Sequence, residues 1–381
     1  MIAHSEGRPL SSVRLLPHRY AIGRAMGTDA DWADWGYLNL AAGWADAERS
    51  MQWLHEKVVD TGRVTFVNGT VETLETETST QKESKNIDTQ GGGCVTGARL
   101  SDGRILSADL VIVAAGAWTP SLVDLSGQAV ATGQCVAYLR LTEDEQAKLA
   151  KMPVSLNLTD GCFVIPPRDC VLKIGRHAYG YLNPQTLSSE PLGEKDGDRH
   201  RRTEKKPATV SKPRTHLTDP SLSIPAEGET DLRRALRCMI PWPDLAERPF
   251  FKTRLCWYTD TATGDWIIDY HPSYENLFIA TGGSGHAFKF LPILGDKVVD
   301  CLMGRCPQDF RDKWKWKGGV DRNRDDKGTE TTEGVVSEDL AVEESISTED
   351  GSRGGKPGQI LEIELAKSGR TSLHLEANGN C

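Results

Sequence analysis

The sequence predicts a mixed α/β fold, and three features of its hydrophobic pattern indicate that class. Residues 41–59 repeat apolar side chains with the period of an amphipathic helix. Residues 110–115 form a continuous apolar run, the pattern of a strand buried on both faces. Residues 277–281 form a short strand that leads through a glycine-rich turn into a helix over 292–303. Helices and strands therefore share one fold.

Each element is predicted from its hydrophobic period and from the turn residues that bound it. In the first helix Ala45, Met51 and Val58 fall near one face, and Gly62 ends it. Asp102-Gly103 is a hairpin turn signal between two strands of a meander. Strands are expected over residues 63–67, 71–74, 95–100, 104–107, 110–115, 267–269 and 277–281.

Composition divides the 381 residues into regions of different character. One stretch is polar and contains five prolines, so it buries too little apolar surface to offset the entropy of ordering. The last stretch carries 14 Asp and Glu against 7 Lys and Arg. The expected organisation is an unassigned segment (1–31), a globular part (32–184), a disordered insertion (185–228), the globular remainder (229–317) and an acidic disordered tail (318–381).

Charge and cysteine usage exclude several classes of protein. The net charge is −9, and because the tail holds most of it, no nucleic-acid footprint is expected on the folded part. The nine cysteines include no CxxC pair, so neither a zinc module nor a disulfide framework is predicted. No apolar run reaches the length of a membrane span, and the chain opens without an apolar signal segment. A cytoplasmic protein with free thiols is the expectation.

A glycine-rich turn follows the strand at 277–281 and is the first candidate site. Gly282, Gly283 and Gly285 surround Ser284, and His286 and Lys289 come directly after them. Backbone amides in such a turn can hold an anion or a planar ring. The turn is not the dinucleotide fingerprint, because Phe288 stands where its third glycine would fall. The alternative interpretation is a tight chain reversal with Lys289 in solvent.

A second candidate site is the turn after the apolar run at 110–115. Ala114, Ala115 and Gly116 are small, so the backbone can approach a ligand closely there. A helix is expected to begin near Pro120, and its N-terminus would favour a phosphate. The alternative is an ordinary strand-to-helix turn.

Three single residues have chemistry that the pattern alone leaves open. Cys256 follows Arg254, which would favour the thiolate at a partly exposed site, although a buried free cysteine is usually a small hydrophobic residue. Lys173 has apolar neighbours and could point inward, although strand lysines more often reach back to solvent. His177 alone is equally consistent with a structural histidine.

Five segments taken together resemble the FAD-dependent amine oxidases. In chain order they read GWADAERSMQWL, ADLVIVAAGAWTPSL, CVLKIGRHAYGY, RLCWYTDTATGDWIIDYHP and ATGGSGHAFKFLPILG. The resemblance is greatest to the fungal fructosyl amino acid oxidase and saccharopine oxidase branch, and monomeric sarcosine oxidase is a more distant relative. It extends from about Trp32 to Arg305. The implied fold is a partial FAD-binding domain of the glutathione-reductase-like class with an antiparallel-sheet substrate domain.

The resemblance implies a role for each candidate residue. Cys256 matches the cysteine that forms a thioether to the flavin 8α-methyl group. Lys173 matches a lysine over the flavin N5 that assists oxygen reduction, and His177 matches a histidine on the substrate side. Lys289 matches a lysine that helps to bind the substrate carboxylate. The implied cofactor contacts are Gly282, Gly283, Gly285 and His286 at the flavin ring, and Ala114, Ala115 and Gly116 at the dinucleotide part.

The implied reaction is oxidation of the C–N bond of a secondary amine to an imine. Electrons pass to FAD and then to dioxygen, which gives hydrogen peroxide. The substrate would be an N-substituted amino acid such as a fructosyl amino acid, saccharopine or an N-methyl amino acid. A monomer that binds this amine and dioxygen, with no metal, is expected.

One departure from the family pattern changes the expectation for this chain. Members begin with a strand, GxGxxG and a helix, and nothing in residues 1–31 fits that pattern. We therefore expect a truncated form whose parallel sheet leaves apolar faces to be covered. The alternative to an enzyme is a non-catalytic paralogue that acts as a binding or interaction protein. The C-terminus also lacks the Ser-Lys-Leu peroxisomal signal.

Overall fold

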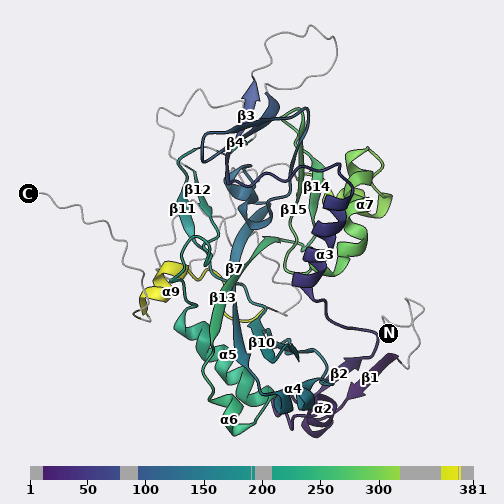
Figure 1. Cartoon of the computed structure of the whole chain (residues 1–381), viewed down its shortest axis with the longest axis vertical. Helices are drawn as coiled ribbons and strands as arrows, with labels where there is room; N and C mark the ends of the chain where they lie inside the picture. The colour runs from purple at the N-terminus through teal and green to yellow at the C-terminus, as the bar shows by residue number, and fades with distance from the viewer. Residues whose placement is uncertain are drawn as a thin grey trace, which may run out of the picture.

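The computed structural model describes residues 12–77, 93–189, 191–193, 208–317, 353–367 and 369. Its largest sheet has five antiparallel strands in the order β13-β7-β10-β9-β8. Two long strands, β7 and β13, cross the middle of the molecule (Figure 1) and pair along their whole length. The strands of this central sheet are β7 (Ala129–Arg140), β8 (Ser155–Leu156), β9 (Cys162–Arg168), β10 (Val171–Arg176) and β13 (Lys252–Thr261).

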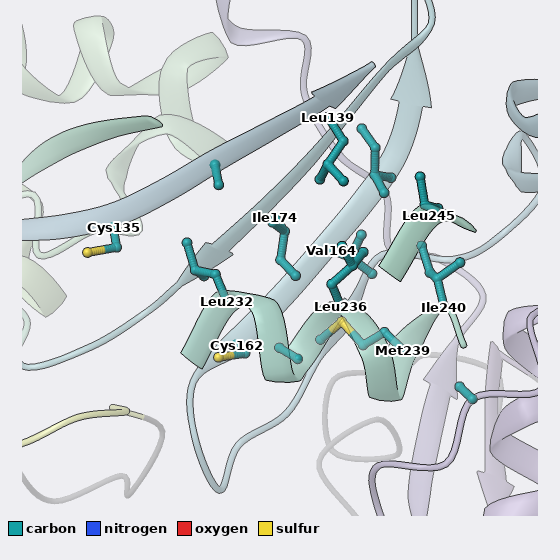
Figure 2. Packing of buried hydrophobic residues seen from close by; sticks show 14 of the residues in the cluster. Cys135, Leu139, Cys162, Val164, Ile174, Leu232, Leu236, Met239, Ile240 and Leu245 are labelled. Atoms are coloured by element: carbon teal, nitrogen blue, oxygen red, sulfur yellow. The ribbon is translucent and has the colours of Figure 1, made fainter. Parts of the chain in front are cut away.

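One face of the central sheet packs on helix α5 (Ala226–Met239) and forms the main hydrophobic core. The helix places Leu232, Ala235, Leu236 and Met239 on one side, at the spacing of three and four that an apolar helical face requires. Because side chains alternate along a strand, only every second sheet residue meets this helix. Figure 2 shows the packing of Leu139, Val164 and Ile174 against Leu232, Leu236 and Met239.

A second, three-stranded sheet has the order β14-β15-β6, and β15 runs parallel to β6. Strand β14 pairs with β15 antiparallel, so the sheet is mixed; we call it the parallel sheet after its β6–β15 pair. Helices α7 and α8 pack on one face of it, where Ile268, Phe278 and Trp314 form a separate core. A third sheet, β3-β4-β5, packs beside it. The elements are β3 (Val71–Glu77), β4 (Cys94–Leu100), β5 (Ile105–Ser107), β6 (Val111–Val113), β14 (Ile267–Tyr270), β15 (Leu277–Thr281), α7 (Leu291–Leu302) and α8 (Gln308–Trp314).

The remaining elements lie outside the three sheets and three helices described above. Two of the strand pairs, β1-β2 and β11-β12, are two-stranded sheets. These elements are β1 (Val13–Leu16), α2 (Arg19–Met26), β2 (Gly36–Asn39), α3 (Ala47–Asp60), η2 (Gly116–Ser121), α4 (Glu143–Leu149), β11 (Pro184–Thr186), β12 (Thr209–Ser211), α6 (Pro243–Ala246), η4 (Ala287–Phe290) and α9 (Leu361–Lys367). Within the described ranges no helix is long and apolar enough to cross a bilayer.

The mixed α/β class and the antiparallel sheet are confirmed, and several local predictions need correction. The first helix begins at Ala47 because the Asp46 side chain accepts a hydrogen bond from the backbone of Arg49 and caps it. No strand forms over 63–67, where Val64 and Phe66 are exposed and have no neighbouring strand among the described residues. The hairpin at Asp102-Gly103 is confirmed.

The prediction that residues 110–115 are buried on both faces is wrong for strand β6. Val113 is buried, but Ile112 has 45% of its surface exposed. Strand β6 lies at the edge of its sheet, whereas α7 and α8 pack on β14. An apolar face of the parallel sheet is therefore open.

The predicted disorder of the insertion and the tail is wrong for the parts that the structure describes. Strands β11 and β12 pair within or beside 185–228, and Leu361 and Leu365 of α9 are buried in the main core. The segment left unassigned at the N-terminus also contributes Ile22 and Met26 of α2 to that core. Tertiary contacts order these segments, although their own composition is polar. Residues 194–207 of the predicted insertion lie outside the described residues.

Candidate cofactor and substrate site

A cavity of about 450 Å³ lies beyond the carboxyl ends of the parallel strands β6 and β15. This edge of a parallel sheet is where α/β proteins bind their ligands. Two of the predicted motifs meet here although they are far apart in sequence, since Ala114 and Gly116 line the cavity together with Gly283 and Gly285. The volume is within the range of pockets that hold small molecules.

Hydrogen bonds of side-chain hydroxyls connect the turn after β6 with the turn after β15. Thr281, at the end of β15, donates a hydrogen bond to the backbone oxygen of Gly116 at 3.4 Å. Its hydroxyl also lies 3.3 Å from that of Thr119 in η2. Gly116 is followed by this 3-10 helix rather than by the α-helix predicted near Pro120. The two turns therefore form one wall of the cavity.

Small residues are required where the glycine-rich turn meets Tyr258. Gly285 has φ 76°, and a Cβ at this position would lie 2.6 Å from the ring of Tyr258. Ser284 also adopts a left-handed backbone with φ 45°, and its hydroxyl accepts a hydrogen bond from the backbone of Thr261. Tertiary contacts thus fix the conformation of the turn.

Two buried polar atoms beside the cavity have no hydrogen-bond partner among the described residues. They are Nε1 of Trp266, which lines the cavity, and Nδ1 of His286. The Nε2 of His286 lies 2.8 Å from the backbone oxygen of Gly264, so it donates there and leaves Nδ1 as an acceptor. A buried donor and a buried acceptor left unpaired in an apolar wall indicate a missing polar ligand. A flavin ring, which is flat and carries both donors and acceptors, fits these residues.

The face of the central sheet opposite α5 carries the other candidate residues. We name it the site face and define it by Tyr138, Lys173, Arg254, Cys256 and Tyr258. The pairing register places them on the same face. Lys173 of β10 lies opposite Tyr138 of β7, and Cys256 of β13 lies opposite Gln134, four residues from Tyr138 along β7.

The sequence leaves open whether Arg254 favours a thiolate at Cys256 or whether Cys256 is a small hydrophobic residue. Burial raises the pKa of the Cys256 thiol, and the nearby cations of Lys173 and Arg254 lower it by less. The thiol is therefore protonated in the resting chain. The two cations lie where they could stabilise negative charge close to the sulfur.

Tyr258 connects the site face to the cavity, and we did not predict this role from the sequence. Its hydroxyl lies 3.5 Å from Nδ1 of His177, and its ring lines the cavity next to Gly285. Burial raises the pKa of Tyr258 and the carboxylate of Asp260 raises it further, so the hydroxyl stays protonated. The spacing Cys256-x-Tyr258 could have indicated the shared face, because strand residues two apart point the same way.

Of the eleven predicted site residues, four line the cavity (Ala114, Gly116, Gly283 and Gly285) and seven do not, among them Lys289, Ala115 and Gly282. Lys289 is exposed in η4, with its ammonium 5.1 Å from the ring centre of Phe290. Ala115 packs into the core beside β6, and Gly282 turns the chain with φ 80°. Ala115 and Gly282 thus support the two turns, and the roles assigned to all the candidate residues stay predictions.

Comparison of the chain with known proteins identifies its family. A family model described as FAD dependent oxidoreductase (DAO) matches residues 9–301, which includes part of the unassigned N-terminal segment. The amino acid oxidase imqH of Aspergillus flavus is 32% identical over 303 residues, covering 74% of this chain and 63% of that protein. The L-saccharopine oxidase of Schizosaccharomyces pombe is 29% identical over 302 residues, covering 77% of this chain and 61% of that protein.

Solved structures give the same result for the fold. A fructosyl peptide oxidase from E. terrenum superposes with a TM-score of 0.68 at 26% identity, over 84% of this chain and 68% of that one. The chain spans less than two thirds of the length of the curated relatives it matches. The cavity at the ends of β6 and β15, the paired turns and the match over 9–301 lead to one conclusion: the chain belongs to the family of FAD-dependent oxidoreductases.

Proposed function

We propose that the site oxidises the C–N bond of a secondary amine, an N-substituted amino acid, and passes the electrons through FAD to dioxygen. The products are an imine and hydrogen peroxide. The observation that supports this most directly is the cavity between the two small-residue turns, which Tyr258 joins to the site face with Lys173 and Cys256. The substrate would be a fructosyl amino acid, saccharopine or an N-methyl amino acid.

The chain's own residues would hold the cofactor in the cavity. Ala114, Gly116 and Gly283 would let the backbone approach the ligand closely. Trp266 would donate a hydrogen bond from Nε1, and His286 would accept one at Nδ1. FAD would supply the redox chemistry by accepting the hydride equivalent from the substrate.

Lys173 and His177 would act on the reacting molecules from the site face. The ammonium of Lys173 belongs to no ion pair among the described residues, so its charge could stabilise negative charge that develops on dioxygen. His177 would face the substrate, and its contact with Tyr258 would orient the ring. Lys289 follows Phe288, which lines the cavity, and its exposed ammonium could pair with the substrate carboxylate.

Cys256 would carry FAD through a thioether bond. We expect the purified chain to show flavin absorbance that remains with the protein after acid precipitation. Cys256→Ala should abolish this covalent flavin, whereas Cys94→Ala, at another half-buried free cysteine, should not. Flavin that stays non-covalent in all three proteins would overturn the attachment and leave the cofactor assignment intact.

The activity itself is tested by peroxide formation. The flavin-loaded chain should release hydrogen peroxide with at least one of fructosyl valine, saccharopine and sarcosine. Lys173→Met should lower the turnover number by about a hundredfold, the usual effect of removing a charge that stabilises a transition state. Flavin binding without peroxide from any secondary amine would reject the proposed reaction.

A second candidate function is a binding or interaction protein without turnover. It is favoured by the exposed apolar surface, since Ile112 is open on β6 and helix α3 buries none of its residues among those described. A chain that neither binds FAD nor releases peroxide, yet folds cooperatively, would support this function over the enzyme.

A further inference from the structure

The C-terminal segment, residues 353–367, returns to the central sheet beside the site face. Gly354 forms a bridge with Ala178, and Ile360 forms a second bridge with Leu182. Helix α9 then packs on α5, and its Leu361 and Leu365 enter the main core. Figure 1 shows α9, in yellow, next to α5 and β13. A segment remote in sequence is therefore part of the wall around the site.

The first contact of this segment is a buried ion pair. The side chain of Arg353 has 6% of its surface exposed, and its guanidinium lies 2.7 Å from the fully buried carboxylate of Asp260. Thr132 donates a hydrogen bond to the same carboxylate. Asp260 follows Tyr258 by two residues in β13, so both side chains point to the site face.

Arg353 also contacts Tyr258, which connects the site face to the cavity, and the backbone beside His177. Its guanidinium carbon lies 5.6 Å from the ring centre of Tyr258, in the geometry of a cation–π contact. Its Nη1 donates a hydrogen bond to the backbone oxygen of Ala178 at 3.0 Å. Ala178 directly follows His177, so the Arg353 side chain contacts Tyr258 itself and the residue next to its partner His177.

The backbone next to Arg353 holds His177 directly. The amide of Gly354 donates to the backbone oxygen of His177 at 2.8 Å, and the amide of His177 donates to Gly161 at 2.7 Å. The fit leaves no room for a side chain, since a Cβ on Gly354 would lie 1.7 Å from the oxygen of Asp160. His177 is thus fixed between two chain segments.

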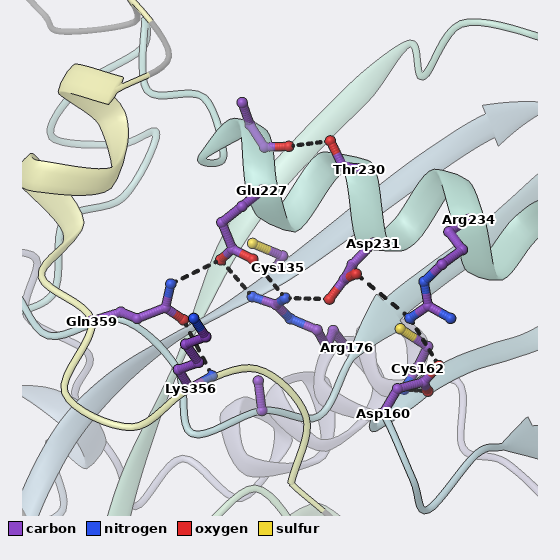
Figure 3. Close-up of polar contacts among 12 residues, drawn as sticks. Cys135, Asp160, Cys162, Arg176, Glu227, Thr230, Asp231, Arg234, Lys356 and Gln359 are labelled. Atoms are coloured by element: carbon purple, nitrogen blue, oxygen red, sulfur yellow. Dashed lines mark hydrogen bonds and ion pairs between the residues drawn. The ribbon is translucent and has the colours of Figure 1, made fainter.

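A second anchor fixes the segment further along (Figure 3). Gln359 donates to the carboxylate of Glu227 at 3.4 Å. That carboxylate and Asp231 together bind Arg176, which has only 2% of its side chain exposed. Arg176 directly precedes His177, so both anchors act on the chain around the same histidine.

We propose that Arg353 is a positioning residue: by neutralising Asp260 it sets the orientation of Tyr258 and His177 at the edge of the cavity. The inference rests on the proposed function for the meaning of His177, but the contacts that carry it are independent of any cofactor. Arg353 would act through these two residues. Removing the Arg353 side chain should therefore change the orientation of Tyr258 and His177 while the fold is retained.

The test compares Arg353→Gln with a matched control in the same segment. Glu362→Gln removes the ion pair of Glu362 with Arg214, which anchors α9 away from His177. Proteins labelled with ¹³C-histidine give one ring signal for each histidine, and His177→Asn assigns the signal of His177. We expect Arg353→Gln to shift or broaden that signal without changing the other histidines. Glu362→Gln should leave it unchanged, and Arg353→Lys should restore it in part.

Two further arms keep the proposal falsifiable. If the unpaired Asp260 prevents Arg353→Gln from folding, the double variant Asp260→Asn/Arg353→Gln removes both charges and should fold, still with a displaced His177 signal. In the flavin-loaded protein Arg353→Gln should lower kcat about tenfold or more with little change in KM, as misplacement of a reacting group does.

The outcomes separate this inference from the proposed function. A His177 signal that is the same in the native chain, Arg353→Gln and the double variant overturns the positioning role. A displaced signal in a protein that releases no peroxide supports the positioning role while rejecting the reaction. An unchanged signal with a raised KM would also overturn it, since Arg353 would then bind the substrate itself.

Discussion

The central sheet and the parallel sheet differ in how completely this chain covers them. The central sheet packs on α5, and the C-terminal segment adds a buried ion pair and the side chains of Leu361 and Leu365. The parallel sheet is covered by α7 on β14, whereas Ile112 on β6 remains open. The stability of the fold is therefore concentrated in the sheet that carries the predicted catalytic residues, while the cavity lies at the less covered sheet.

Arg176→Met should lower the free energy of unfolding most, because it removes the buried cation that pairs with Glu227 and Asp231 beside the central sheet. Among the described residues it would leave Glu227 without its cation, and Asp231 would keep only Arg234, at 3.5 Å. Breaking such a pair by removing one partner costs about 3–5 kcal/mol of the free energy of unfolding. Urea denaturation measures it. Arg234→Met is the control, since the Arg234 side chain is 49% exposed and its pairs should contribute less than about 1 kcal/mol.

Leu236→Ala should destabilise the same region somewhat less. Leu236 is fully buried between α5 and the central sheet (Figure 2), and truncation leaves a cavity that costs about 3 kcal/mol. Thermal unfolding measures the change, with Leu217→Ala as the control because Leu217 is 83% exposed. Equal effects of the two substitutions would contradict the assignment of the core.

The parallel sheet should show a pH-dependent weakness that centres on His271. This residue follows β14, is 4% exposed and has an unpartnered Nε2 among the described residues. Burial lowers the pKa of His271 to about 4, although Asp124 opposes the shift. A lowered pKa stabilises the fold above the unfolded value of about 6.5, and this contribution is lost as the pH falls toward 4.

The expected loss is about 3 kcal/mol between pH 6.5 and 4, from 1.36 kcal/mol for each unit of pKa difference. Unfolding free energies measured across this range should fall in the native chain and fall less in His271→Asn. His55→Asn, at an exposed histidine, should follow the native chain. A native slope that persists in His271→Asn would assign the acid sensitivity to other groups.

Ile112→Thr should have the smallest effect, because the side chain is already open to solvent. We expect the free energy of unfolding to change by less than about 0.5 kcal/mol, whereas Val113→Thr on the buried face should cost several times more. Chemical denaturation of both variants checks the contrast. A large effect at Ile112 would show that another part of the protein covers β6 in solution.

The sequence predicts the parts of this fold that follow from local pattern. The strand and turn at 277–285 were identifiable because apolar runs and glycines carry their own signal. Pairing of the two small-residue turns into one cavity was implied only by the family resemblance. Burial raises the pKa of the Cys256 thiol by more than the neighbouring cations lower it. The spacing of residues along one strand does not reveal how deeply a side chain is buried.

The missed elements depend on contacts between distant residues. Helix α9 has the sequence LEIELAK, and its few apolar residues lie within an acidic segment, too weak a signal to distinguish it from solvated chain. Arg353 has no recognisable motif around it, and its partner Asp260 lies 93 residues earlier. Tyr258 and Trp266 belong to the Cys256 segment that carries the family resemblance. That they line the cavity can be seen only in the tertiary structure.

The pairing of Gly354 with Ala178 also has a consequence for the order of events during synthesis. Most of the central sheet can collapse on α5 as soon as residue 261 has been made, yet His177 gains its second neighbour only when residue 354 follows. Contacts of such long sequence separation form late, because closing the intervening chain costs entropy before any contact compensates for it. The nascent protein can therefore form most of the central sheet and its contact with α5 before the segment that holds His177, and that completes the core with Leu361 and Leu365, has been made.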